Sequence, residues 1–198
     1  MTGYKAFLAK EFTEMMKTHK VLIILSVFIL LGIMSPILAQ MMPDILAGMT
    51  ESMAEEGMTI TIAGPTIADS YFQLFKNFTQ MGLIVVLLVY SNMLSGELSK
   101  GTLTALLAKG LSRDAVILAK YTAAISWWTI ALAASSGMAY LYNIILFGKH
   151  NAQHIIFSVF CLWLFVSFVI ALILLSSVIV KGSVGAWLFQ LGALEQCL

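Results

Sequence analysis

The sequence predicts an all-α integral membrane protein: a polytopic bundle of transmembrane helices with an amphipathic interfacial helix at its N-terminus. Hydrophobic residues make up 60% of the 198 residues and charged residues only 11%, whereas soluble domains carry about 25% charged residues. The apolar residues are gathered into long runs, and a helix needs roughly 20 such residues to cross a hydrocarbon core about 30 Å thick. The few charges lie mostly between the runs, where they mark loops and set orientation.

Residues 1–20 precede the first apolar run and predict a short amphipathic helix lying on the membrane surface. Its apolar face comprises Tyr4, Phe7, Leu8, Phe12, Met15 and Met16, and most of its charged residues, Glu11 among them, are expected elsewhere on the helix. The first crossing follows directly at residues 21–41. A cleaved signal peptide is the alternative for this region, but the amphipathic segment before the run is long and Leu38-Ala39-Gln40 fits a cleavage site poorly.

Three more crossings and their connecting segments are expected further along the chain. The expected crossings are residues 21–41, about 75–94, 121–147 and 155–180, within a transmembrane domain over residues 21–181. An acidic external loop is expected over residues 43–74, with a strand-like alternation at 58–62, and a basic loop over residues 95–120. Residues 182–198 are apolar but too short to cross, and predict the start of a fifth, truncated helix.

The distribution of basic residues predicts the orientation. Nine bases fall on one side of the predicted membrane, namely Lys5, Lys10, Lys17, Lys20, Lys100, Lys109, Arg113, Lys120 and Lys181, and two on the other, Lys76 and Lys149. Cytoplasmic loops carry the excess of Lys and Arg in membrane proteins. We therefore expect a multi-pass protein of the cell membrane with a cytoplasmic N-terminus, a cytoplasmic loop over 95–120 and an external loop over 43–74.

The basic loop carries the motif on which function depends. It contains Glu97, then Gly101-Thr102-Leu103, then Ser112-Arg113, and it ends at Lys120. In this respect it resembles the loop between the second and third membrane helices of type-2 ABC exporter permeases. The resemblance extends from the amphipathic N-terminal segment, which is similar to that family's elbow helix, through the fourth crossing, or about nine-tenths of the chain.

The resemblance implies a permease subunit of an ATP-driven exporter, which provides the translocation path and couples to a separate cytosolic ATPase subunit. A second permease subunit, identical or similar, and the lipid bilayer are the other implied partners. The ATPase contact would comprise Glu97, Lys100, Gly101, Thr102, Leu103, Leu106, Leu107 and Arg113. Independently of the family, Gly101 and Gly110 can bracket a short helix with a leucine face suited to a groove. A basic loop resting on anionic lipid headgroups is the alternative.

Other classes of function have less support in the sequence. There is no phosphate-binding loop of the G-x-x-x-x-G-K type and no Cys, His and carboxylate cluster with metal-site spacing. We therefore expect no enzymatic activity, no cofactor and no nucleic-acid partner. A non-transport membrane protein, such as an assembly, immunity or scaffold factor, remains the main alternative, and an intramembrane enzyme is least supported because no catalytic pair lies deep in a crossing.

Two further features of the sequence limit the interpretation. Family members usually have six membrane helices, so four crossings and a fragment imply a truncated chain or a lost remainder, which leaves transport competence and substrate open. Within the third crossing, Ser126, Ala133, Ala134 and Gly137 predict a helix-packing stripe. The polar residues Asn92, Ser135, Ser136 and Asn143 are too scattered along the sequence to be assigned a role.

Overall fold

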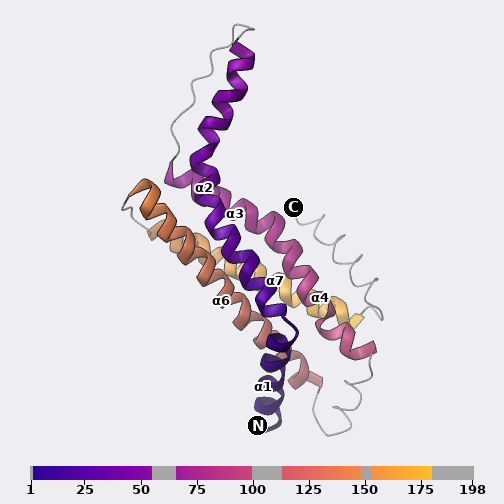
Figure 1. Ribbon diagram of the computed structural model, residues 1–198. Helices are drawn as coiled ribbons and strands as arrows, with labels where there is room; N and C mark the ends of the chain where they lie inside the picture. The colour runs from indigo at the N-terminus through magenta and orange to yellow at the C-terminus, as the bar shows by residue number, and fades with distance from the viewer. Residues whose placement is uncertain (1, 55–65, 100–112, 149–152, 180–198) are drawn as a thin grey trace.

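The computed structural model describes residues 2–54, 66–99, 113–148 and 153–179, and within these ranges the chain is helical (Figure 1). The elements are α1 (Thr2–Lys17), α2 (Lys20–Ala54), α3 (Ile67–Asn77), the π-helix η1 (Phe78–Gly82), α4 (Leu83–Ser99), α6 (Arg113–Phe147) and α7 (Gln153–Ile179). Among the described residues, four stretches are long and apolar enough to cross a membrane: Lys20–Ile45, Ile67–Ser91, Asp114–Phe147 and Ile155–Ser176. The predicted fold class, a polytopic helical membrane protein, is confirmed.

The long helices alternate in direction, as Figure 1 shows. Helices α2 and α6 run away from the N-terminal helix, whereas the continuous rod of α3, η1 and α4 runs back toward it, as does α7. The end of α4 and the start of α6 therefore lie at the same end of the bundle as α1. We call this the α1 end.

The helices are longer than the charge pattern predicts. Helix α2 continues to Ala54 through Pro36 and Pro43, and α3 begins at Ile67, so much of the expected external loop is helical. Likewise, α4 extends to Ser99 and α6 starts at Arg113, inside the expected basic loop. The physical reason is that polar residues mark where a helix leaves hydrocarbon, but they do not end the helix. The strand-like residues 58–62 lie outside the described residues.

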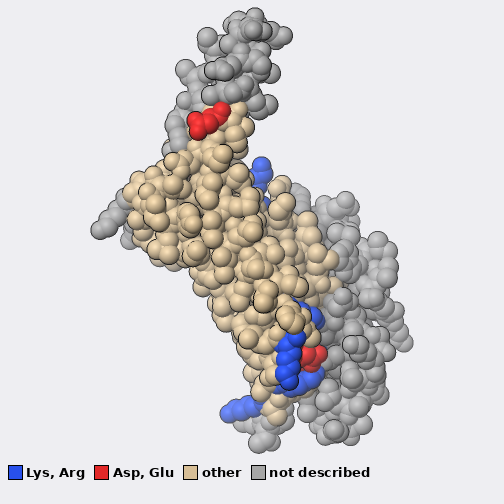
Figure 2. Space-filling model, in the orientation of Figure 1, with Lys and Arg blue, Asp and Glu red and all other residues tan. Residues whose placement is uncertain are grey.

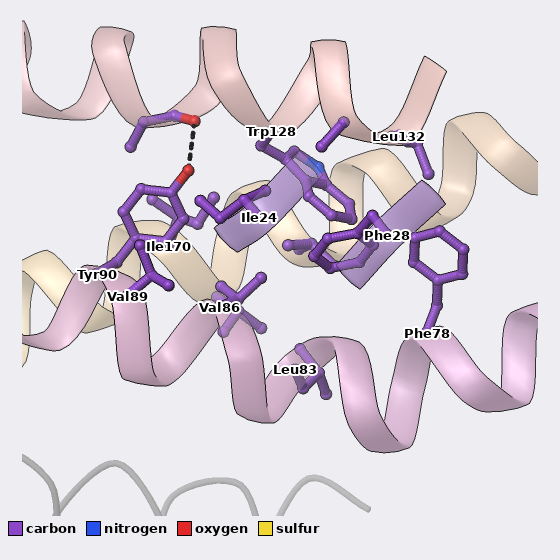
Figure 3. Packing of buried hydrophobic residues seen from close by; sticks show 14 of the residues in the cluster. Ile24, Phe28, Phe78, Leu83, Val86, Val89, Tyr90, Trp128, Leu132 and Ile170 are labelled. Carbon is purple, nitrogen blue, oxygen red and sulfur yellow. Dashed lines mark hydrogen bonds between the residues drawn. The ribbon is translucent and has the colours of Figure 1, made fainter. Parts of the chain in front are cut away.

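The core of the bundle is an aromatic cluster between α2, η1 and α6 (Figure 3). The ring of Phe28 lies 5.0 Å from Phe78 and 5.2 Å from Trp128, with the Trp128 contact edge-on. Such tilted and edge-on pairs are the favoured geometries of aromatic rings. Nearby, the Tyr90 hydroxyl donates a hydrogen bond of 3.1 Å to the carbonyl oxygen of Ala124, which satisfies a polar group that would be costly to bury alone.

The small residues that pack on α6 differ from those predicted. Ala133 and Gly137 are exposed, and a Cβ built on Gly137 would meet nothing within 4 Å. The buried small residues of α6 are instead Ala123, Ala124, Ala131, Ser135 and Ala139. The predicted stripe was wrong because spacing alone does not say which of two small-residue faces is turned toward the neighbouring helices.

The surface between the two ends of the molecule carries almost no charge on the face shown in Figure 2. Large apolar side chains point outward there; Phe157 of α7, for example, is 70% exposed, and Ile156 and Phe168 are similarly open. A surface of this kind is costly in water but suits hydrocarbon. The charged side chains seen on this face gather at the α1 end, with a few at the opposite end.

Candidate functional site

Helix α1 packs its apolar face against the beginning of α6. Phe7 is buried together with Val116 and Ala119 of α6, and the ring of Phe12 lies 5.7 Å from that of Trp127. The apolar face predicted for α1 is therefore largely a contact with protein. Met16 is the exception, because it is 56% exposed.

The length of α6 explains how a helix outside the hydrocarbon can dock on it. Its apolar span, Asp114–Phe147, has 34 residues, which at 1.5 Å per residue is about 51 Å. The hydrocarbon core is only about 30 Å thick. Several turns of α6 must therefore project from the hydrocarbon unless the helix is strongly tilted, and α1 covers its first turns.

An ion pair is buried at the centre of this contact. The Lys120 ammonium nitrogen lies 3.0 Å from Oε2 of Glu11, and the two side chains are only 1% and 3% exposed. The other carboxylate oxygen, Oε1, lies 3.4 Å from the ammonium nitrogen of Lys10. The Phe7 ring lies beneath both ammonium groups, 5.9 Å from that of Lys120 and 5.2 Å from that of Lys10. Aromatic faces attract cations at such distances.

The sequence did not predict this pair. Glu11 was assigned to the polar side of α1, but it lies four residues after Phe7 and four before Met15, on the buried face. That spacing is the signal that could have found it, because a carboxylate on an apolar helix face needs a cation or hydrogen-bond donors to be buried. Lys120 was noticed as part of the loop motif, but its burial was not.

The structure places only two of the predicted ATPase-contact residues. Glu97 lies in α4, two residues before the helix ends at Ser99, and Arg113 is the first residue of α6. Both belong to helix termini at the α1 end (Figure 1). The other six, Lys100, Gly101, Thr102, Leu103, Leu106 and Leu107, lie outside the described residues, in the segment that connects α4 to α6.

A second polar feature lies deeper in the bundle, where α2, α3 and α6 meet. Ser35 of α2 is fully buried, donates to the Leu31 carbonyl oxygen at 2.7 Å and accepts from Asn77 Nδ2 at 3.3 Å. Close by, α2 approaches α6 at Gly32, where an added Cβ would lie 2.7 Å from the Ser135 hydroxyl oxygen. That hydroxyl is buried and has no hydrogen-bond partner among the described residues. The fold thus brings together polar residues that looked scattered in the sequence.

No group of three or more metal-ligating side chains occurs within the described ranges. A charge-poor helical bundle with charged, helix-capped ends and a basic inter-helix segment defines a multi-pass membrane protein. The family model of the ABC-2 family transporter proteins matches residues 6–194, so the chain belongs to this family. It is accordingly a membrane permease of ABC transporters, and the resemblance noted in the basic loop is confirmed at the level of the family.

Comparison with individual proteins adds one relative. The chain is 24% identical over 181 residues to the uncharacterized transmembrane protein YxlG of Bacillus subtilis (strain 168), an alignment that covers 91% of this chain and 69% of the relative. No solved structure matches the chain.

Proposed function

We propose that this permease belongs to an exporter of the cell membrane and is driven by a separate cytosolic ATPase subunit that binds residues 97–113. The observation that carries the proposal is the match to a transporter family, together with the position of this segment between α4 and α6. ATP hydrolysis would occur on the partner. The permease would convert it into movement of α4 and α6, whose ends hold the segment on both sides.

The charge distribution of the described residues supports a cytoplasmic N-terminus. The bases of the α1 end are Lys5, Lys10, Lys17, Lys20, Arg113 and Lys120, whereas Lys76 lies in α3 toward the opposite end. The opposite end also carries Asp44 and Asp69. An excess of bases on one side favours the cytoplasm for that side.

A docking experiment tests the ATPase contact. We expect the double variant Leu103→Asp/Leu106→Asp to lose co-purification with the cognate ATPase in detergent, because it would bury charge in an apolar contact at a cost of several kcal/mol. The matched control, Lys109→Gln, should change binding by about 0–1 kcal/mol, as expected for an exposed charge. All three proteins must first be shown to insert equally.

The outcome distinguishes the two main candidate functions. Full ATPase binding by the double aspartate variant would overturn the docking assignment and leave the segment as a lipid-facing basic loop. Failure of the wild-type permease to bind any ATPase would favour a non-transport membrane protein. Co-purification of two differently tagged copies would test the proposed pairing with a second permease subunit.

Orientation can be tested separately. Single cysteines at Glu55 and Lys109, in a background without Cys161 and Cys197, should react with an impermeant maleimide from opposite sides of intact cells. Reaction of both from the outside would contradict the proposed topology.

A further inference from the structure

We infer that the buried Glu11–Lys120 ion pair fastens α1 to the start of α6, so that the two helices move as one body during transport. Helix α1 is then a moving arm of the permease rather than a fixed membrane float. This inference rests on the proposed coupling to an ATPase, because that coupling supplies the movement of α6.

The first argument is electrostatic. Both oxygens of Glu11 face an ammonium group, Oε2 that of Lys120 at 3.0 Å and Oε1 that of Lys10 at 3.4 Å. The pair is removed from water on both sides of the contact. Pulling α1 away from α6 while the site stays closed to water would leave two uncompensated charges, which is far less favourable than parting apolar surfaces. The ion pair therefore opposes separation and fixes the position of one helix along the other.

The second argument is that the contact has several points. The buried cluster of Phe7, Val116 and Ala119 lies on one side of the ion pair. The Tyr4 hydroxyl lies 3.2 Å from the Thr122 hydroxyl oxygen, about half a turn beyond Lys120 on α6. Contacts spread over nearly two turns of both helices prevent α1 from rotating about a single point.

The third argument is the break between α1 and α2. Helix α1 ends at Lys17, and His19 adopts a φ of 59°, in the left-handed region. That conformation is uncommon for a residue other than glycine, and it interrupts the helical run. Helix α2 then restarts, with the Ile23 amide donating to the His19 carbonyl oxygen at 3.0 Å.

Together these contacts divide the α1 end mechanically. Helix α1 makes more extensive contact with α6 than with α2, to which it is joined in sequence. The break at Thr18–His19 is then the pivot, and a displacement of the start of α6 is delivered through α1 to the start of α2. Glu11 and Lys120 are positioning residues in this scheme, because they act by holding α1 rather than by contacting cargo.

A covalent tether tests the rigid-body inference without disturbing the ion pair. In a background of Cys161→Ser and Cys197→Ser, the variant Tyr4→Cys/Thr122→Cys would be joined by a short bifunctional thiol reagent in the complex with the ATPase. We expect vanadate-sensitive ATP hydrolysis in proteoliposomes to stay within twofold of the same variant capped with a monofunctional reagent. Suppression of hydrolysis to the level of the ATPase without permease would show that α1 and α6 must separate, and would overturn the inference.

Charge exchange tests the ion pair itself. Glu11→Gln and Lys120→Gln should each lower permease-stimulated ATP hydrolysis at least fivefold, and Glu11→Lys/Lys120→Glu should recover half or more of it. Recovery is expected because the carboxylate moved to α6 would then face the amines of residues 10 and 11 on α1. Lys5→Gln, on the exposed face of the same helix, is the control for loss of charge and should hydrolyse ATP as wild type does.

The two experiments separate failure of this inference from failure of the proposed function. If the wild-type permease binds and stimulates the ATPase but the exchange is no better than the single variants, the ion pair is not the link. If the single variants fail to fold, the tether still decides the question, because it leaves the ion pair intact. Absence of ATPase binding by the wild type would instead refute the proposed function.

Discussion

Replacement of Gly32 by alanine should push α2 and α6 apart. A Cβ at this position would lie 2.5 Å from the backbone carbonyl oxygen of Ser135, whereas ordinary contact begins at 3.4 Å, a shortfall of 0.9 Å. Because the obstacle is backbone, no side-chain rotation can relieve it, and the helices themselves must shift. Overpacking of this kind costs about 1–3 kcal/mol, offset by at most about 1 kcal/mol from the better helix propensity of alanine.

The expected net loss is therefore about 1–2 kcal/mol, or roughly 2–8 °C in the unfolding temperature of a chain of this size. The measurement is thermal unfolding of the purified permease in one detergent. Gly137→Ala is the matched control, because Gly137 lies in α6 with nothing within 4 Å of an added Cβ, and it should unfold at the wild-type temperature or slightly above. A Gly32→Ala variant as stable as the Gly137→Ala variant would refute the close approach of α2 and α6.

Three further predictions address packing, capping and buried polarity. Trp128→Ala should destabilise the permease by about 3–5 kcal/mol in the same assay, because it empties the centre of the aromatic core, whereas Phe157→Ala, at a 70% exposed position, should change stability by less than about 1 kcal/mol. Thr66→Ala removes the side-chain cap of α3 and should cost about 1 kcal/mol, with faster hydrogen exchange in the first turn of α3 as its local signature. Ser135→Ala removes a buried hydroxyl that lacks a partner, so we expect the unfolding temperature to rise; a fall would show that the hydroxyl is satisfied.

Much of the fold could be predicted from composition and run length. The apolar runs place the cores of all four membrane-spanning helices, because a bilayer demands continuous helix and tolerates little charge. Helix ends were less predictable. The continuation of α2 to Ala54 through Pro43 shows that charges and prolines mark the membrane boundary more reliably than the helix boundary.

The candidate site was less accessible to sequence reasoning, because its parts lie far apart in the chain. Glu11 and Lys120 are separated by 109 positions, and periodicity within α1 could show that Glu11 faces inward but not which residue it meets. The same holds for Gly32 and Ser135, whose contact depends on the rotation of α6 about its own axis. Local patterns encode faces of helices, whereas the pairing of faces is decided by packing of the whole bundle.

The position of α6 in the bundle suggests why both interfaces lie on this helix. Helix α6 contacts α1, α2, α3 and α7, and its 35 residues contain no proline, whereas α2 carries Pro36 and Pro43. A helix without proline keeps its complete set of backbone hydrogen bonds and resists bending, and one with internal prolines bends more readily. A displacement applied at the start of α6 would therefore travel along it with little loss, whereas α2 can bend to accommodate it. On this argument, variants that introduce proline near the middle of α6 should uncouple the two ends of the permease, while replacement of Pro36 by alanine should stiffen α2 and slow the transport cycle without preventing ATPase binding.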